Sequence, residues 1–327
     1  MEEGQYFESE QTDISGVSAL AEKLREQIST VIVGQHEMLE LLLAGLLADG
    51  HILIEGVPGV AKTLTAKLMA KMLSVQFSRI QFTPDLMPSD VTGTSVFNPQ
   101  SASFSFRPGP IFANIVLIDE INRAPAKTQA SLFEVMEEKQ VTIDGFSYKL
   151  EAPFMVLATQ NPIEHEGTYR LPEAQLDRFL MKINVAYPSL EEEIKILTQQ
   201  NIKPVAELIQ SVEAIVSREE LVEARQQVRA VFVEEKIIAY IANIVFETRN
   251  DRSLYVGASP RASIALLNVS KAIAVVRGRN FVIPEDVAYA VLPVLRHRVI
   301  LMPEREMEGS SPDEILKEIL KRIEIPR

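Results

Sequence analysis

Residues 56–63 of this chain read Gly56-Val57-Pro58-Gly59-Val60-Ala61-Lys62-Thr63. A strand-like run, His51–Glu55, precedes this stretch, and a helix-like run, Leu64–Leu73, follows it. Glycines let a backbone curl so that successive N–H groups point at phosphate oxygens, and a following helix adds the positive end of its dipole. Lys62 can reach the β- and γ-phosphates, and Thr63 offers a hydroxyl to Mg²⁺. The stretch therefore predicts a nucleotide-phosphate-binding loop between a strand and a helix.

Ala61 departs from the strict pattern G-x-x-x-x-G-K-[ST], which has glycine at that position. Alanine is the smallest residue with a Cβ, so we expect the loop to form if Ala61 needs no positive φ. The alternative is a Gly/Pro turn beside an unrelated lysine. We predict nucleotide contacts along the whole loop and at the residue after it: Gly56, Val57, Pro58, Gly59, Val60, Ala61, Lys62, Thr63 and Leu64.

The composition excludes several classes of protein. The chain has 327 residues and no cysteine, so disulfides and thiolate metal sites are excluded. A net charge of −12 and a sequence pI of about 5.0 disfavour broad nucleic-acid binding, which needs a basic face. No apolar run reaches the roughly 18 residues of a membrane span. We therefore expect a soluble cytoplasmic protein, long enough for two domains.

Five apolar runs with strand character occur in the first 188 residues. They are Ile52–Glu55, Phe77–Phe82, Asn114–Asp119, Phe154–Thr159 and Phe179–Val185. Helix-like runs, among them His36–Leu47, lie between or before them. Asn114–Asp119 is almost wholly apolar, as expected for a central parallel strand buried on both faces. The pattern predicts an α/β domain with a five-stranded parallel sheet flanked by helices.

The sequence changes character after residue 188. Strand-like runs disappear, and helical periodicity takes over. The predicted helices are Leu190–Gln200, Leu208–Ile215, Arg218–Val231, Glu234–Asn250, Arg261–Gly278, Pro284–His297 and Pro312–Arg322. We predict three parts: a flexible tail at residues 1–16, an α/β nucleotide-binding domain at residues 17–188 and a helical domain at residues 189–327.

Two segments of the α/β domain have the signature of hairpins. Thr83–Pro110 contains five prolines and is too long for an ordinary connection, which indicates a functional loop or hairpin. Val141–Leu150 is centred on Asp144-Gly145, a strong hairpin turn signal. Plain surface loops are the alternative for both segments.

Asp119 and Glu120 end the most apolar strand. A buried strand tolerates acids at its carboxyl end, where ligand sites of α/β sheets lie. Asp119 is placed to hold the water shell of Mg²⁺, and Glu120 to orient and deprotonate an attacking water. Ordinary solvated acids are the alternative, but the phosphate-binding loop is predicted at the same edge of the sheet.

Three further polar residues are candidate catalytic groups. Asn161 follows the strand Phe154–Thr159 and could hydrogen-bond the water or the γ-phosphate, although an Asn-Pro pair also makes ordinary turns. Arg178 precedes the fifth strand, where it could instead satisfy carbonyls or an acid at a helix end. Arg261 lies in the first turn of a helix, where a cation opposes the helix dipole, so we expect an anion nearby.

Together these motifs resemble the MoxR family of AAA+ ATPases. The matching pieces are Gly56–Thr63, Met87–Gly93, Asp119–Ala124, Ala158–Pro162, Leu171–Phe179 and Gly257–Arg261, in that order. The resemblance runs from Val31 to about His297, with Arg170 standing where proline is expected. It implies a P-loop AAA+ core with a C-terminal all-α lid domain.

The resemblance implies a role for each candidate. Gly56–Thr63 is similar to Walker A, and Asp119-Glu120 to Walker B. Asn161 resembles sensor 1. Arg261 resembles sensor 2, on the lid, and Arg178 an arginine finger from an adjoining copy, so that both arginines converge on a triphosphate held by Lys62 and magnesium.

Other segments also find counterparts in the family. Val33-Gly34-Gln35 resembles the segment that lines the adenine, which makes Gly34 and Gln35 candidate nucleotide contacts. Thr83–Phe106 resembles the insertion in helix 2, and Val141–Leu150 resembles the hairpin before sensor 1.

The implied activity is an Mg²⁺-dependent ATPase that couples ATP binding and hydrolysis to chaperone-like remodelling or maturation of partner proteins. The implied partners are a homo-hexamer, protein clients and a protein with a von Willebrand factor A domain. One alternative is a nucleic-acid motor, against which the acidic balance and the lack of basic residues in Thr83–Phe106 count. The other is a low-turnover nucleotide-gated scaffold, against which the intact Glu120 counts.

Overall fold

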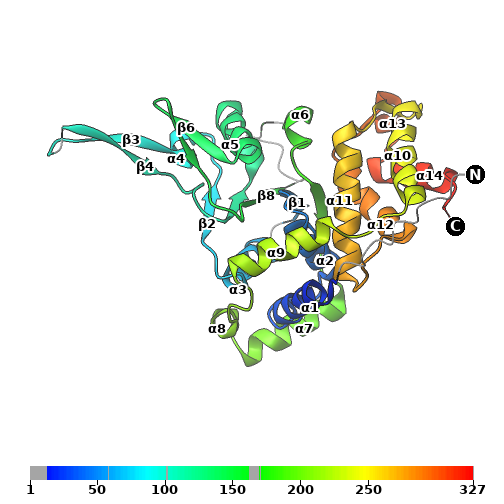
Figure 1. The fold of residues 1–327 in the computed structure, drawn as a ribbon, viewed down its shortest axis with the longest axis horizontal. Helices are drawn as coiled ribbons and strands as arrows, with labels where there is room; N and C mark the ends of the chain where they lie inside the picture. The colour runs from blue at the N-terminus through cyan, green and yellow to red at the C-terminus, as the bar shows by residue number, and fades with distance from the viewer. Residues whose placement is uncertain (1–12, 58, 101, 162–168, 170, 327) are drawn as a thin grey trace, which may run out of the picture.

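The computed structural model describes residues 13–57, 59–100, 102–161, 169 and 171–326. Figure 1 shows a sheet with helices around it, a group of helices on its right and a two-stranded arm that projects to the left. Within these residues no helix combines the length and the apolar character that a membrane span requires.

The central sheet has five strands, all parallel, as predicted. They are β1 (Ile52–Gly56), β2 (Phe77–Gln81), β5 (Ile115–Asp119), β8 (Met155–Gln160) and β9 (Met181–Val185). Their order in the sheet is β2-β5-β8-β1-β9. The register pairs Ile54 with Thr159 and Ile118 with Ala158, so the carboxyl ends of β1, β8 and β5 lie side by side.

Each face of the sheet has its own hydrophobic core. On β1, Ile52 and Ile54 belong to one core and Leu53 to the other, because successive side chains of a strand point to opposite faces. The helices that precede β2 all contribute to the first core: α1 (Ser15–Ser29), α2 (His36–Leu47) and α3 (Lys62–Met72). Helix α5 (Ala126–Glu138) packs on the second face with Leu132 and Phe133.

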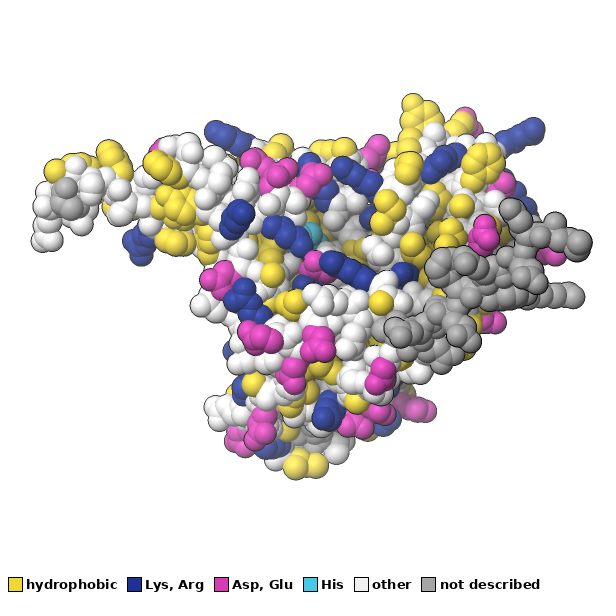
Figure 2. Space-filling model, in the orientation of Figure 1, with side chains coloured by type: hydrophobic (Ala, Val, Ile, Leu, Met, Phe, Trp, Pro, Cys, Tyr) yellow, Lys and Arg dark blue, Asp and Glu magenta, His cyan; other side chains and the backbone are white. Residues whose placement is uncertain are grey.

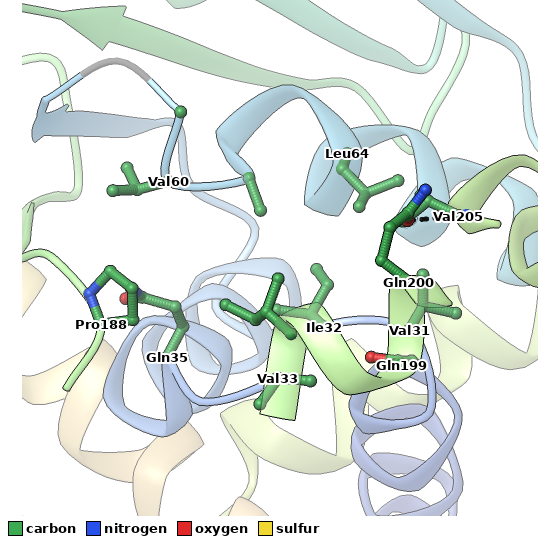
Figure 3. Close-up of a pocket in the computed structure, with 13 residues that line it drawn as sticks. Val31, Ile32, Val33, Gln35, Val60, Leu64, Pro188, Gln199, Gln200 and Val205 are labelled. Atoms are coloured by element: carbon green, nitrogen blue, oxygen red, sulfur yellow. Dashed lines mark hydrogen bonds between the residues drawn. The ribbon is translucent and has the colours of Figure 1, made fainter. Parts of the chain in front are cut away.

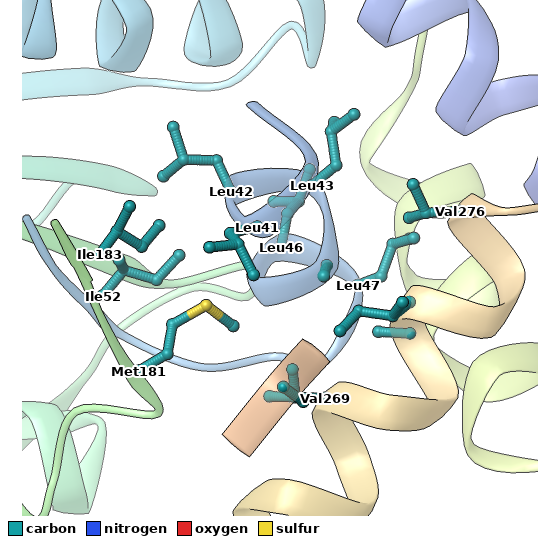
Figure 4. Close-up of a cluster of buried hydrophobic side chains, with 14 of the residues drawn as sticks. Leu41, Leu42, Leu43, Leu46, Leu47, Ile52, Met181, Ile183, Val269 and Val276 are labelled. Carbon is teal, nitrogen blue, oxygen red and sulfur yellow. The ribbon is translucent and has the colours of Figure 1, made fainter. Parts of the chain in front are cut away.

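Helix α2 joins the sheet to the C-terminal helices. It is buried along almost its whole length. In Figure 4 its leucines lie between the sheet residues Ile52, Met181 and Ile183 and the residues Val269 and Val276 of helix α11 (Pro260–Val276). The predicted boundary after residue 188 therefore separates two parts of the chain that share one continuous core.

The region after residue 188 is helical, as predicted. Its helices are α7 (Leu190–Ile202), α8 (Val205–Ser211), α9 (Arg218–Arg229), α10 (Glu235–Asn250), α11, α12 (Pro284–Leu295), α13 (Pro303–Met307) and α14 (Pro312–Arg322). The expectation that strands disappear is wrong in one detail. Two short antiparallel strands, β10 (Leu254–Val256) and β11 (Ile300–Leu301), are present but too short to produce a periodic signal.

Two predicted boundaries also need correction. The helix expected at Leu208–Ile215 is α8, which starts earlier, directly after Pro204, and ends at Ser211. The chain after it is extended, and the N–H groups of Ile215 and Val216 donate to the carbonyl oxygen of Met72. Helix α1 begins at Ser15, inside the predicted tail; residues 1–12 of that tail lie outside the described residues.

Both predicted hairpin segments contain hairpins. Beyond the short helix α4 (Pro88–Thr92), strands β3 (Gly93–Asn98) and β4 (Ser103–Pro108) form the arm of Figure 1. Strands β6 (Gln140–Ile143) and β7 (Phe146–Lys149) form the second hairpin. Gly93 at the base of the arm has φ +95°, and a Cβ there would lie 2.3 Å from the carbonyl oxygen of Arg107.

Candidate functional site

The predicted phosphate-binding loop connects the end of β1 to the start of α3. The strand ends at Gly56 and the helix begins at Lys62, whose Nζ donates to the carbonyl oxygen of Gly56 at 2.6 Å. Gly56 has no room for a side chain, because a Cβ there would lie 2.7 Å from the carbonyl oxygen of Val185. Pro58, also predicted to contact nucleotide, lies outside the described residues.

Ala61 is the N-cap of α3, and the expectation that it needs no positive φ is wrong. Its φ is +59° and its ψ is +16°, in the left-handed region. The loop must reverse direction there to begin the helix, and this reversal is what glycine usually permits. An L-residue in this conformation is strained by roughly 1–2 kcal/mol.

Replacing Ala61 by glycine should therefore stabilise the folded protein. We expect a gain of about 0.5–1 kcal/mol in the free energy of unfolding, because the strain exceeds the extra chain entropy of glycine. Urea unfolding measures this free energy. The control is Ala66→Gly in the middle of α3, which should lose stability because glycine is unfavourable inside a helix. A loss of stability in Ala61→Gly would contradict the strain assigned here.

The predicted lysine and acids meet at the carboxyl edge of the sheet. Burial lowers the pKa of Lys62, and the opposite charges of Asp119, Glu120 and Glu55 counteract this effect. The structure thus brings the end of the loop within electrostatic reach of both acids that end β5. Such a cation beside two carboxylates can bind the phosphates and Mg²⁺ of a nucleotide together.

Four side chains that sequence reasoning missed hold the two acids. The Thr159 hydroxyl donates to Asp119 Oδ1 (3.2 Å) and accepts the N–H of Glu120 (3.1 Å). Arg79 Nε lies 2.6 Å from Asp119 Oδ2. Glu120 Oε2 is 2.8 Å from Arg123 Nε and 3.0 Å from Gln81 Nε2.

Some of these partners left a signal in the sequence. Arg79 and Gln81 are separated by one residue in β2, so the sequence places both polar side chains on the same face of that strand. Thr159 lies within the motif Ala158–Pro162, but no local pattern there pairs its hydroxyl with Asp119.

Asn161 and the predicted metal ligands lie where the sheet topology requires. Asn161 is buried and directly follows β8, the strand between β1 and β5. Among the described residues no three His, Cys, Asp or Glu side chains form a metal cluster. Thr63 and Asp119, the two predicted ligands, would together supply two oxygen donors. That number suits Mg²⁺, which takes most of its ligands from phosphates and water, and does not suit a metal held by protein alone.

A cavity of about 280 Å³ lies beside the loop (Figure 3). It is lined by Val31, Ile32, Val33, Gln35, Gly59, Val60, Ala61, Leu64, Pro188, Ile196, Gln199, Gln200 and Val205. Its walls are mainly apolar, as suits a planar base, and it opens onto the phosphate-binding loop. The predicted contacts Gln35, Gly59, Val60, Ala61 and Leu64 all line it.

Part of this cavity could not be predicted from sequence. The walls from α7 and α8, with Ile196, Gln199 and Val205, come from a region expected to belong to the other domain. Gly34, also a predicted nucleotide contact, is not among the residues that line the cavity. It lies against α7, where a Cβ on Gly34 would lie 2.5 Å from Glu192 Oε1. Gln35 Nε2 donates to the carbonyl oxygen of Ala186 (3.1 Å).

Arg178 and Arg261 meet at the opposite edge of the sheet. Arg178 Nη2 and Nε lie 2.7 and 2.8 Å from Glu137 Oε2, and Arg261 Nη2 lies 3.2 Å from Glu137 Oε1. Arg178 precedes β9, whose first residue, Met181, pairs with Ile52 at the amino end of β1. A five-residue strand, roughly 17 Å long, separates this edge from the phosphate-binding loop.

This arrangement corrects the implied position of Arg261. The side chain does not converge with Lys62 on one nucleotide within the chain, because it lies beside Arg178 instead. The anion expected near Arg261 is Glu137, at the end of α5. Arg178 also pairs with Glu137, which agrees with the alternative prediction that Arg178 satisfies an acid at a helix end. Its side chain remains 29% exposed.

A buried ion pair fixes the helix that carries Arg261. Arg298 is 3% exposed, and its Nε lies 2.7 Å from Asp177 Oδ1. The other oxygen of Asp177 accepts from the hydroxyl of Ser259, the N-cap of α11. These contacts hold α11 against Asp177, the residue next to Arg178.

Arg178, Arg261 and Glu137 line a hollow of about 230 Å³, together with His51, Met136 and Asp177.

His51 is a neutral buried side chain in this hollow. Its Nδ1 accepts from the N–H of Val156 (2.9 Å), and its Nε2 lies 3.1 Å from the carbonyl oxygen of Met136. Burial lowers the pKa of His51 to about 4. Burial also lowers the pKa of His297, whose Nε2 lies 3.1 Å from the carbonyl oxygen of Phe179.

Stability should therefore fall in mild acid. Below its ordinary pKa of 6.5 the unfolded His51 ring takes up a proton, which the folded ring does not accept until about pH 4. Between pH 7 and 4 this difference in protonation lowers the free energy of unfolding by about 3 kcal/mol. Urea unfolding across this range should show a smaller loss for His51→Gln and an unchanged loss for the exposed His36→Gln. Equal losses in all three proteins would contradict the assignment.

Two family models match the chain. "ATPase family associated with various cellular activities (AAA)" matches residues 51–181, and "AAA lid domain" matches residues 246–319. The chain is 44% identical over 310 residues to the chaperone MoxR1 of Mycobacterium tuberculosis, across 92% of this chain and 81% of that protein. The chain belongs to the MoxR family of AAA ATPases. It is an ATPase, and it binds ATP.

Other relatives of this MoxR-family ATPase match along most of their length. The uncharacterized protein YeaC of Bacillus subtilis is 47% identical over 305 residues, across 93% of this chain and 94% of that protein. A crystal structure from Cytophaga hutchinsonii has a TM-score of 0.84 and 41% identity, covering 97% of this chain and 100% of that chain. The AAA core and helical lid expected from the sequence are thus confirmed.

Proposed function

We propose that this MoxR-type ATPase hydrolyses Mg²⁺-bound ATP at the carboxyl edge of its sheet and uses the cycle for chaperone-like remodelling of partner proteins. The observation that carries the proposal is the meeting of Lys62, Asp119 and Glu120 beside a cavity of about 280 Å³. The remodelling activity is supported by the relative that bears the name chaperone MoxR1.

Each residue of this edge has a proposed task. Lys62, which contacts the Gly56 carbonyl, would exchange that oxygen for a phosphate oxygen of ATP. Thr63 and Asp119 would hold Mg²⁺, which neutralises charge on the phosphates when it is bound. Glu120 would orient and deprotonate the attacking water, and Asn161 would hydrogen-bond that water or the γ-phosphate.

The arginines at the other edge would serve a neighbouring copy. Arg178 and Arg261 lie roughly a strand length from the chain's own loop, so neither can neutralise the nucleotide bound there. Both would reach the triphosphate of the next subunit, which makes the contact heterologous and closes a ring. We propose a homo-hexamer, acting in the cytoplasm on protein clients and with a partner that carries a von Willebrand factor A domain.

Removing the metal or the lysine tests the site. We expect steady phosphate release from ATP with Mg²⁺ and none once EDTA removes the metal. Lys62→Ala should lose the calorimetric heat of Mg-ATP binding, because the phosphates lose their main cation. Lys67→Ala, an exposed lysine on the same helix, is the matched control. Absence of a binding heat in the unmodified protein would refute the proposal.

A further inference from the structure

The cavity beside the phosphate-binding loop presents neutral amide side chains to a ligand. Among the described residues that line it, the polar side chains belong to Gln35, Gln199 and Gln200, and no side chain is charged. Charged side chains of both signs lie over the lower end of the molecule, where α7 is found (Figure 2), so the lack of charge is particular to the cavity. Selection of a base by side chains here therefore depends on how these amides are oriented.

The backbone partners of the two amides on α7 determine which amide atom remains for a ligand. Gln199 Nε2 donates to the carbonyl oxygen of Thr30 at 2.6 Å, so its oxygen is the remaining acceptor. Gln200 Oε1 accepts the N–H of Val205 at 3.2 Å, so its nitrogen is the remaining donor. A carbonyl oxygen only accepts and a backbone N–H only donates, so neither amide can flip without losing its partner.

Gln35 offers a second acceptor, at a different place in the cavity. Its Nε2 donates to the carbonyl oxygen of Ala186, which leaves its oxygen for a ligand. Figure 3 shows Gln35 at the end of the cavity that carries Val60 of the phosphate-binding loop, and Gln199 at the other end with Val31. Because the loop holds the phosphates, the outer edge of the base points away from the loop, toward Gln199.

An acceptor at this end suits adenine and opposes guanine. At position 6 adenine carries an amino group, which donates, and guanine carries a carbonyl oxygen, which accepts. A guanine would therefore place two oxygens against each other between apolar walls, and neither would gain a hydrogen bond in exchange for water. The ring nitrogens of adenine are acceptors, which suits the donor nitrogen of Gln200.

We propose that Gln199 selects ATP over GTP, because its side-chain oxygen accepts a hydrogen bond from the 6-amino group of adenine. The proposal rests on the proposed function, since it takes the cavity as the site of the base of the hydrolysed nucleotide. It gives α7 a direct part in nucleotide recognition, although this helix lies after the α/β domain that holds the phosphates.

Calorimetric titration of the full chain with three nucleotides, each with Mg²⁺, tests the proposal. They are ATP, inosine triphosphate, which has a carbonyl oxygen at position 6, and purine riboside triphosphate, which has only hydrogen there. The unmodified protein should bind ATP about tenfold more tightly than purine riboside triphosphate and at least about a hundredfold more tightly than inosine triphosphate.

Matched variants assign this selectivity to one residue. Gln199→Met keeps the length of the side chain and removes the amide, so both affinity ratios should fall below about threefold. Gln226→Met, which changes an exposed glutamine on α9, is the control and should keep the ratios of the unmodified protein. Gln35→Met should also keep them, because its oxygen lies at the loop end of the cavity.

Three results would overturn the assignment. These are equal affinities of the unmodified protein for ATP and purine riboside triphosphate, unchanged ratios in Gln199→Met, and loss of selectivity in Gln35→Met in place of Gln199→Met. The first result needs no variant, so it does not depend on whether a substituted chain folds. If the unmodified protein gives no binding heat with any of the nucleotides, the proposed function fails. If it binds all three equally, only the recognition of the base fails.

Discussion

Replacing Glu120 by glutamine is expected to lower the kcat of ATP hydrolysis about 10²–10⁴-fold, which is the usual contribution of a positioned general base. The amide keeps the size of the side chain and can still contact Arg123, but it cannot take a proton from water. ATP binding should persist, because Lys62 and the cavity beside the loop are unchanged. The measurements are phosphate release at saturating ATP and calorimetric affinity for Mg-ATP.

Glu134→Gln is the matched control for this variant. Glu134 is an exposed acid on α5, distant from the sheet edge that carries Glu120, and its substitution should leave both measurements unchanged. Hydrolysis at the normal rate by Glu120→Gln would place the base elsewhere. Loss of ATP binding together with hydrolysis would instead assign Glu120 to nucleotide affinity.

The second large effect is expected from Arg178. In an assembled ring Arg178→Ala should lower kcat about 10³–10⁵-fold, the range of an arginine supplied by a neighbouring molecule. Binding of ATP by the subunit itself should be nearly unchanged, since Arg178 lies at the edge of the sheet opposite its own loop. Arg261→Ala should act in the same direction, because both guanidinium groups share Glu137.

Mixing variants decides whether the arginine acts between subunits. Arg178→Ala retains an intact Glu120, and Glu120→Gln retains an intact Arg178. In a 1:1 mixture roughly a quarter of the interfaces of a heterologous ring pair the two intact groups, so part of the activity should return. No recovery on mixing would place Arg178 in its own subunit's reaction. Normal hydrolysis by Arg178→Ala alone would show that Arg178 has no catalytic role. Arg305→Ala, which changes an exposed arginine, is the control and should hydrolyse ATP normally.

Features encoded in consecutive residues were predictable from the sequence. The five strands are short apolar runs, and α2 was predicted with both ends correct, at His36 and Leu47. The phosphate-binding loop, the acids after β5 and the family itself follow from short motifs. Each depends on local backbone preference or on a residue type at a fixed spacing, so a neighbouring stretch of chain contains the whole signal.

Contacts between distant segments were decided only by the tertiary structure. Arg79 reaches Asp119 across forty residues, Gln199 lines a cavity with Val31, and Glu137 binds Arg178 and Arg261 from separate elements. Even the left-handed φ of Ala61 is imposed by the loop around it. Sequence by itself determined which chemical groups and which elements this ATPase has. Packing decided which of these groups meet. Two distant side chains come into contact only where the sheet and helices bury their apolar faces against each other, and a local sequence pattern does not contain that information.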